Sequence, residues 1–370
     1  MASLACTLAG LHLDCAIFNA SGPRTGAAEA LARISSSAAG AVLAKSATVN
    51  GQDGNDKPRT WQGDAASLNS EGLPNKGIDY YLDAATVAAA KGETGKPYFV
   101  SLSGKNLAEN LEMLRRADRI EGISAIELNL ACPNVIGHPI IAYDFDQMEA
   151  VLDEVEKIVL SVPLGIKMPP YFDFQHFKKA ADLLNTYDCV SYVATINTLG
   201  NALAIDVDAE QPLIRPKGGF GGMSGPAVKH TALANVKKLR ELLRDDIDVV
   251  GVGGVRSGRD AFEMFLCGAT AVQVGTCHWI EGPQCFDRIA SELRALMREK
   301  GYATLDDFRG KLKPWSKERA SESRAQRRAA KQAEAASASA SGAQRAYLAI
   351  IALLVAAVAF LLAKDQGLLL

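Results

Sequence analysis

Short apolar runs alternate with amphipathic stretches, and the alternation repeats eight times between residues 16 and 300. The runs are five to seven residues long, which suits strands buried on both faces. They span 16–21, 41–46, 98–102, 125–130, 163–168, 191–197, 248–254 and 271–275. The stretches have apolar residues at helical spacing and span 26–37, 78–91, 106–118, 145–161, 174–186, 228–244, 258–267 and 284–300. Eight such βα units predict an α/β fold, a (β/α)8 TIM barrel.

The residues at the carboxyl ends of these runs favour the barrel over a doubly wound sheet, which could alternate in the same way. Barrel enzymes build their active sites at that face and hold phosphate in the loops after strands seven and eight. Different strands here end in Lys45, Asn129, Lys167, Asn197, Gly253–Gly254 and Gly275–Thr276. The two glycine-bearing loops are those that follow strands seven and eight.

The sequence "GVGGVRSG" is not a dinucleotide-binding fingerprint, because Arg256 stands where the third glycine is required. We interpret it as a loop that approaches a phosphate closely with a helix N-terminus behind it. A plain tight turn is the alternative. Two adjacent loops of this kind favour phosphate.

Composition excludes several classes. Of the 370 residues, 48% are hydrophobic and 22% are charged, as is usual for soluble globular enzymes. The net charge of −2 gives no general attraction to nucleic acid. Seven scattered cysteines without a C-x-x-C pair predict reduced thiols in a cytosol-like compartment, with no disulfide framework, and together with five isolated histidines they predict no metal site. The first 14 residues lack a secretory signal and alternate like a short β-hairpin.

The composition changes after residue 315. Residues 311–345 contain nine basic and three acidic residues, a net charge of +6, and end in an Ala/Ser-rich stretch. Residues 346–363 then run without a charge, and 18 helical residues rise about 27 Å, close to the roughly 30 Å of a bilayer core. We predict a barrel over 1–315, a linker over 316–345, a transmembrane or membrane-docking helix over 346–363 and a short tail over 364–370. A buried core helix is the alternative for 346–363.

Basic residues flank the apolar segment on its N-terminal side, which predicts that the barrel lies in the cytoplasm. The same residues could bind anionic lipid, or they could form a solvated spacer. The sequence does not identify which membrane is involved.

Two lysines and a cysteine at strand ends are the candidate chemistry. A lysine inside a barrel is costly unless it meets an anion or polar groups, so Lys45 and Lys167 indicate a polar site, a salt bridge being the alternative for each. Cys132 lies in "ELNLACPN", where it could be a small core residue or a reactive thiol. Amides could read the N–H and C=O edge of a pyrimidinedione, although asparagine is also common in turns. The candidates are Asn69, Asn129, Asn134 and Asn197.

Residues 3–315 resemble the class I dihydroorotate dehydrogenases of the fumarate-linked branch. The matching segments occur in family order along the whole predicted barrel. They are "NASGP", "AKSAT", "NSEGLPNKGIDYYLD", "ELNLACPNVIGHPIIAYDFD", "GIKMPPYFD", "INTLGNALAID", "KGGFGGMSG", "GVGGVRSGRDAFEMFLCGATAVQVGT" and "EGPQCFDRI". The resemblance implies an FMN enzyme of pyrimidine (UMP) biosynthesis that oxidises dihydroorotate to orotate and passes the electrons to fumarate, and it favours a homodimer.

The resemblance also implies roles for individual residues. Cys132 would remove the proton from C5 of dihydroorotate while a hydride leaves C6 for the flavin, and Lys167 would stabilise the reduced flavin. The substrate would be bound by Lys45, Asn69, Gly72, Leu73, Asn129, Asn134, Asn197 and Thr198. FMN would be held by Ala20, Ser21, Lys45, Ser46, Asn129, Lys167, Ile196, Gly225, Gly253, Gly254, Gly275 and Thr276. Residues 135–143 would form a mobile lid.

Three features depart from the family pattern. Glu71 replaces a methionine beside the carboxylate pocket, which is tolerable if its side chain points to solvent and unfavourable to an anionic substrate if it points inward. Thr198 replaces a serine and keeps the hydroxyl. The membrane-like tail is the third departure, because the fumarate-linked enzymes are typically soluble, whereas the quinone-linked class has an N-terminal membrane segment and a serine base.

Two other functions stay open on the sequence alone. One is a related flavin oxidoreductase that uses quinone or NAD as acceptor or acts on another dihydropyrimidine. The other is a membrane-tethered binding protein that has lost turnover.

Overall fold

The computed structural model describes residues 2–132, 140–322, 324–325, 328–329 and 332. The chain divides into two compact units, Met1–Leu312 and Lys313–Leu370. Among the described residues, no helix is long and apolar enough to cross a membrane. The predicted helix 346–363, most of the predicted linker and the tail 364–370 lie outside the described residues, so these assignments stay predictions.

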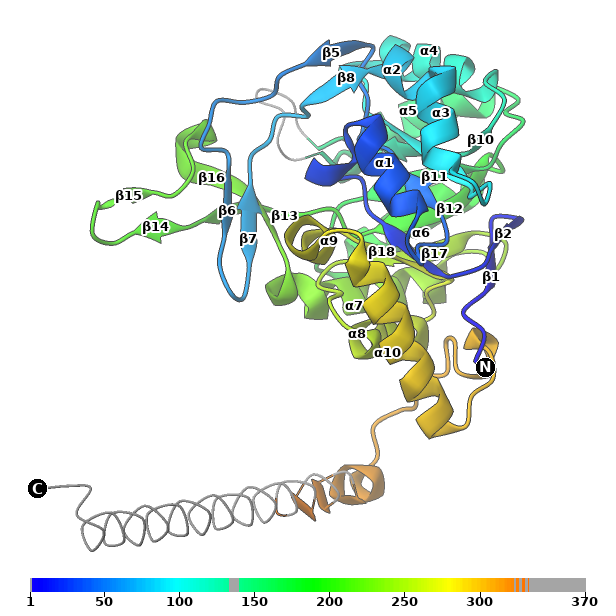
Figure 1. Cartoon of the computed structure of the whole chain (residues 1–370), viewed down its shortest axis with the longest axis vertical. Helices are drawn as coiled ribbons and strands as arrows, with labels where there is room; N and C mark the ends of the chain where they lie inside the picture. The colour runs from blue at the N-terminus through cyan, green and yellow to red at the C-terminus, as the bar shows by residue number, and fades with distance from the viewer. Residues whose placement is uncertain (1, 133–139, 323, 326–327, 330–331, 333–370) are drawn as a thin grey trace, which may run out of the picture. The chain divides into compact units, whose positions relative to one another are not determined.

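The first unit is built on a single sheet of eight strands that curves into a nearly closed barrel (Figure 1), and every adjacent pair in it is parallel. The strand order is β3-β18-β17-β12-β11-β10-β9-β4. The bounds are β3 (Ile17–Asn19), β4 (Val42–Leu43), β9 (Tyr98–Leu102), β10 (Ile123–Asn129), β11 (Leu164–Met168), β12 (Val190–Thr195), β17 (Asp248–Val252) and β18 (Ala271–Val274). All eight predicted strands are therefore confirmed.

Helices follow the strands, and their buried faces match the predicted amphipathic stretches. They are α1 (Ala28–Ser35), α2 (Ile78–Leu82), α3 (Ala84–Lys91), α4 (Leu107–Asp118), α5 (Phe145–Glu156), α6 (Phe174–Thr186), α7 (Lys229–Leu242), α8 (Gly258–Leu266), α9 (Thr276–Glu281) and α10 (Gln284–Lys300). The single helix predicted over 78–91 is wrong in one respect, because it is two helices. Asp83 adopts an extended conformation between them, and its carboxylate caps α3 by accepting from Ala85 N and Thr86 N.

A side chain bridges the two edge strands of the barrel sheet. The Asn19 amide accepts a hydrogen bond from Leu43 N at 3.0 Å and donates one to Leu43 O at 2.6 Å. Asn19 is fully buried. These bonds replace a backbone ladder between β3 and β4, so a polar residue inside the core is part of the barrel's closure.

Aromatic side chains fill part of the barrel core. The rings of Phe18 and Phe99 lie 5.6 Å apart, and those of Phe99 and Tyr192 lie 6.3 Å apart. Tyr192 fits because its neighbour on β11 is Gly165, where a Cβ would lie 2.0 Å from the tyrosine ring.

Smaller antiparallel elements decorate the barrel. The predicted N-terminal hairpin is confirmed as β1 (Cys6–Leu8) and β2 (Leu11–Leu13), joined by Ala9 and Gly10, both at positive φ. A four-stranded sheet in the order β13-β16-β7-β6 was not predicted. Its strands are β6 (Thr60–Gln62), β7 (Ser67–Asn69), β13 (Leu199–Leu203) and β16 (Phe220–Ser224). The pairs β5 (Asn50–Gln52) with β8 (Asn75–Gly77) and β14 (Ile205–Asp206) with β15 (Gln211–Pro212) complete the set.

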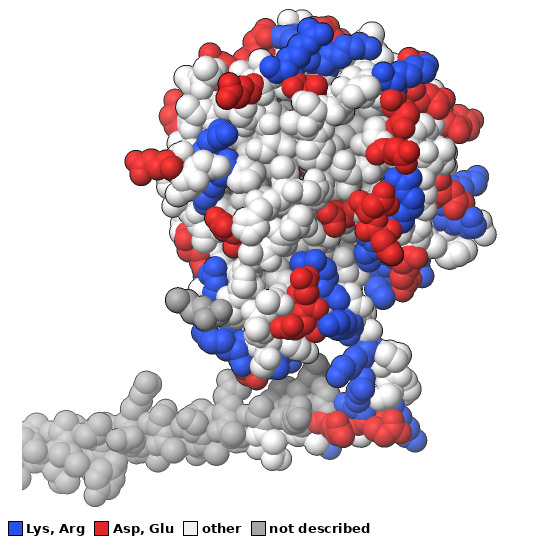
Figure 2. Space-filling model, turned by 90° about the vertical axis from the view of Figure 1, so that its right-hand side faces the viewer, with Lys and Arg blue, Asp and Glu red and all other residues white. Residues whose placement is uncertain are grey.

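The hairpin of β14 and β15 projects away from the barrel (Figure 1). On the face shown in Figure 2, acidic and basic side chains are interspersed around a largely uncharged centre. This mixture agrees with the small net charge of the chain.

Candidate active site

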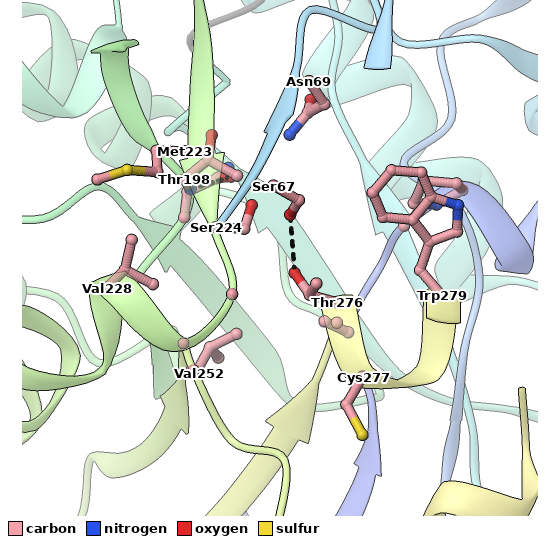
Figure 3. Close-up of a pocket in the computed structure, with 18 of the residues that line it drawn as sticks. Ser67, Asn69, Thr198, Met223, Ser224, Val228, Val252, Thr276, Cys277 and Trp279 are labelled. Carbon is pink, nitrogen blue, oxygen red and sulfur yellow. Dashed lines mark hydrogen bonds between the residues drawn. The ribbon is translucent and has the colours of Figure 1, made fainter. Parts of the chain in front are cut away.

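A cavity of about 310 Å³ opens at the carboxyl ends of the barrel strands. Strands β7 and β16 of the additional sheet lie against it, and Ser67, Asn69 and Met223 border the same space as Thr276 at the start of α9 (Figure 3). Ser67 Oγ and Thr276 Oγ1 lie 3.3 Å apart and share a hydrogen bond. The additional sheet is thus tied to the loop after the eighth barrel strand.

Most of the predicted site residues line this one cavity, although they come from nearly the whole length of the barrel. They are Ala20, Ser21, Lys45, Ser46, Asn69, Leu73, Asn129, Cys132, Lys167, Ile196, Asn197, Thr198, Gly225, Gly253, Gly254, Gly275 and Thr276. Gly72 does not line the cavity itself but precedes Leu73, which does. Asn134 and residues 135–139 of the predicted lid lie outside the described residues.

Lys167 is held by a buried polar chain that crosses the barrel. Its ammonium donates to Gln273 Oε1 at 2.9 Å, and Gln273 Nε2 donates to Glu127 Oε2 at 2.7 Å. All three residues are buried. Burial lowers the pKa of Lys167, and the Glu127 carboxylate opposes that shift. The lysine therefore has a fixed position and a charged partner in the wall of the cavity.

Lys45 lies at the other lysine-bearing strand end, where charges of both signs act on it. Burial lowers its pKa most, and the Arg59 guanidinium lowers it further. The Glu71 carboxylate is the largest opposing influence, followed by Cys132. Lys45 and Cys132 thus interact electrostatically within one cavity, and a nearby cation stabilises a thiolate.

The amides and hydroxyls form a connected network. Asn197 Nδ2 donates to Asn129 Oδ1, and Asn129 Nδ2 donates to Ser46 Oγ, each at 3.3 Å. The Ser46 backbone N–H donates to Ser21 Oγ at 2.8 Å. These bonds fix the orientation of both amides. Thr198 also lines the cavity, and its hydroxyl oxygen is buried without a hydrogen-bond partner among the described residues.

The glycine loops after β17 and β18 also line the cavity. Gly253 and Gly254 have φ of +130° and +72°, and a Cβ at Gly254 would lie 2.6 Å from the Lys229 Cβ. A Cβ at Gly275 would meet only the Ala20 Cβ, at 3.8 Å, so the space in front of that backbone is open. Arg256 also lines the cavity and adds a positive charge. Open backbone beside a cation suits a phosphate group.

Of the two orientations considered from the sequence, Glu71 does not adopt the one toward solvent. It lines the cavity, but its carboxylate pairs with Arg59, with 3.0 Å between Nε and Oε2. The side chains of Arg59 and Glu71 are only 17% and 12% exposed. Its charge is therefore partly neutralised by a partner that sequence reasoning did not identify.

Sequence reasoning also missed Glu127 and Gln273. The available signal was a charged or amide residue within an apolar strand: Glu127 lies two residues before Asn129 and so shares its strand face. For Gln273, the available signal was a single polar residue among the apolar neighbours of "AVQVG", which indicates a buried polar contact.

A barrel with a polar cavity at its carboxyl-end face, lined by two buried lysines and a thiol, has the arrangement of an α/β barrel enzyme. Comparison with known proteins is more specific. The family described as "Dihydroorotate dehydrogenase" matches residues 3–297, and the chain belongs to this family. The prediction made from the sequence motifs is confirmed.

Several curated relatives are similar over most of their length. The "Probable dihydroorotate dehydrogenase A (fumarate)" of Enterococcus faecalis is 46% identical over 304 residues, covering 82% of this chain and 97% of the relative. The "Dihydroorotate dehydrogenase (fumarate)" of Saccharomyces mikatae is 47% identical over 294 residues, covering 80% and 93%. Among solved structures, ligand-free DHODH from Eimeria tenella has a TM-score of 0.70 at 21% identity, covering 84% of this chain and 92% of that chain, which supports the barrel fold.

Proposed function

We propose that the protein oxidises dihydroorotate to orotate in pyrimidine biosynthesis and uses fumarate as the electron acceptor. Family membership supports the reaction class, and the relatives named for fumarate support the acceptor. The observation that carries the proposal is the cavity itself, which brings Cys132, Lys45 and a fixed pair of amides together beside the Lys167 chain.

We assign the proton transfer to Cys132. As a thiolate it takes the proton from C5 of dihydroorotate while the hydride leaves C6, so that the ring loses two hydrogens and a C=C bond forms. Lys45 supplies the positive charge that stabilises this thiolate and attracts the substrate carboxylate. The backbone at Gly72 and Leu73 completes the carboxylate pocket, and Asn69, Asn129, Asn134, Asn197 and Thr198 bind the ring.

FMN fits the remaining residues. The open backbone at Gly275 and the positive-φ glycines of the neighbouring loop suit its phosphate. Bound FMN supplies the hydride acceptor and the route of electrons to fumarate. The residues that would hold it are Ala20, Ser21, Lys45, Ser46, Asn129, Lys167, Ile196, Gly225, Gly253, Gly254, Gly275 and Thr276. Among them, Lys167 places a positive charge in the cavity wall, where it would stabilise added negative charge.

Replacing Cys132 with alanine tests the assignment. The purified protein should be yellow, and dihydroorotate should reduce its flavin in a stopped-flow absorbance experiment. Cys132→Ala should retain FMN and slow that reduction by about 10²- to 10⁴-fold, the usual contribution of a general base. An unchanged rate in the alanine variant would show that Cys132 is not the base.

A survey of acceptors tests the second half of the reaction. Dihydroorotate should reduce the enzyme, and fumarate should then reoxidise it faster than quinone or NAD. Turnover with quinone alone or NAD alone would contradict fumarate, and reduction by dihydrouracil in preference to dihydroorotate would contradict the substrate.

We also propose that the protein is a homodimer with its barrel in the cytoplasm. Exposed apolar side chains on and beside the projecting hairpin support a surface for a second copy: Leu203, Ile205, Val207 and Phe220. Analytical ultracentrifugation would test this, with a monomer at micromolar concentration as the contrary result.

The proposed membrane anchor at 346–363 rests on sequence alone, and cell fractionation with and without residues 346–370 tests it.

A further inference from the structure

The ion pair of Arg59 and Glu71 lies at the end of the cavity that contains Lys45. Both side chains are largely buried, their charged atoms are 3.0 Å apart, and Glu71 lines the cavity. An ion pair removed from solvent in this way acts on neighbouring charges more strongly than a surface pair, because water screens it less.

Both partners are held by further contacts. Arg59 Nη1 donates to the backbone oxygens of Asp53 and Asn55 at 2.6 and 3.0 Å. The Asn55 backbone N–H donates to Glu71 O at 2.9 Å, and Ser70 N donates to Arg59 O at 2.8 Å. Hydrogen bonds thus hold the segments 53–59 and 69–74 together. If the Glu71 side chain turned away, Arg59 would be left as a buried cation without its carboxylate partner.

Lys45, Arg59 and Glu71 together carry a net charge of +1 when the two cations are protonated and Glu71 is ionised. Glu71 is the strongest negative influence on Lys45, while Arg59 acts in the opposite direction. An anionic ligand that binds at Lys45 therefore meets less positive charge than the two cations alone would provide.

We propose that Glu71 is a specificity-determining residue that weakens the binding of anionic pyrimidines by cancelling one of the two positive charges at the carboxylate end of the cavity. The inference rests on the proposed function, since it takes orotate as the anion. Dihydroorotate and orotate share the carboxylate, so the same cancellation favours release of the product. Glu71 touches no reacting atom and acts through the charge that Lys45 and Arg59 present.

Four forms of the FMN-containing protein test this by isothermal titration calorimetry with orotate. In the wild type the local charge is +1, in Glu71→Gln it is +2, in Arg59→Gln it is 0, and in the double variant it is again +1. A unit charge within about 10 Å, at an effective dielectric constant of about 20, changes the dissociation constant roughly tenfold. We expect Glu71→Gln to bind orotate about tenfold more tightly, Arg59→Gln about tenfold more weakly, and the double variant within about twofold of the wild type.

Asp56→Asn is the matched control. It removes the same negative charge from the neighbouring segment 53–59, but Asp56 is 73% exposed and pairs with Arg215 at the surface. Its dissociation constant for orotate should stay within about twofold of the wild type.

The outcomes separate the two proposals. A wild type that binds no orotate overturns the proposed function and this inference together. A wild type that binds orotate, with Glu71→Gln unchanged or weaker, overturns the inference alone, as does a double variant weaker than both single variants. If Glu71→Gln folds poorly, Glu71→Met makes the same change in charge with an apolar chain of similar length, and equal or weaker binding there is equally contrary.

Discussion

Replacing Gln273 with methionine should destabilise the barrel strongly, although the two side chains have nearly the same shape. Gln273 is fully buried and makes two side-chain hydrogen bonds, one to the Lys167 ammonium at 2.9 Å and one to the Glu127 carboxylate at 2.7 Å. Methionine fills the space, but its thioether is only a weak acceptor for the lysine and has no hydrogen to donate to the carboxylate. The substitution therefore leaves two buried charged groups without that partner.

The magnitude follows from those two losses. Leaving a buried polar group unsatisfied costs about 1–3 kcal/mol, and more when the group is charged. Because Lys167 and Glu127 can move toward each other and recover part of the loss, we expect about 3 kcal/mol in total. In a barrel of this size, 1 kcal/mol corresponds to roughly 2 °C in melting temperature, so the expected decrease is roughly 6 °C.

Thermal unfolding of the FMN-containing protein, followed by circular dichroism, measures this decrease. Gln62→Met is the control, because Gln62 is also a strand residue but is exposed, and its change should remain within about 0.5 kcal/mol. A decrease for Gln273→Met as small as that of the control would refute the conclusion that the glutamine holds the two charges in place.

Two further predictions concern other buried polar residues. Burial, reinforced by Arg24 and Arg33, lowers the pKa of His278 from 6.5 to about 4, so the unfolded chain binds a proton between these pH values that the folded barrel does not. The free energy of unfolding should therefore fall by up to about 3 kcal/mol as pH falls from 6.5 to 4. His278→Phe should reduce this pH dependence, measured by urea unfolding at pH 4.5 and 7. Parallel pH profiles of wild type and variant would contradict the assignment. Asn19→Leu should lower the free energy of unfolding by about 2–4 kcal/mol, because it leaves the backbone N–H and C=O of Leu43 unpaired between β3 and β4. A loss under 1 kcal/mol in urea unfolding at pH 7 would show that the closure of the barrel does not depend on this amide.

The candidate site could be predicted from sequence to the extent that its residues end barrel strands or belong to family motifs. Lys45, Asn129 and Lys167 follow apolar strands, and parallel strands bring their carboxyl ends to one face. Arg59 could not be found in this way. It lies outside the eight βα units, and the pairing of β6 with β7, together with two further backbone hydrogen bonds, brings its segment beside Glu71.

The contacts of polar residues within strands could not be predicted from the sequence either, for a different reason. An isolated glutamine in an apolar strand does not reveal its partner, because the neighbour across a barrel depends on curvature and register. Gln273 and Glu127 are 146 positions apart in the chain and meet only because β18 and β10 curve toward the same interior.

The sequence by itself determined the class of fold, the family and the residue types of the site, since strand and helix periodicities and motif order are local properties of a chain. It also located Cys132 at the end of a strand, between amides. The tertiary structure decided which polar groups meet: Lys167 with Gln273, Gln273 with Glu127, and Glu71 with Arg59. It also placed Lys45 and Cys132 in one cavity. Electrostatic interactions depend on distance and burial rather than on order along the chain, and both are set only when the barrel closes.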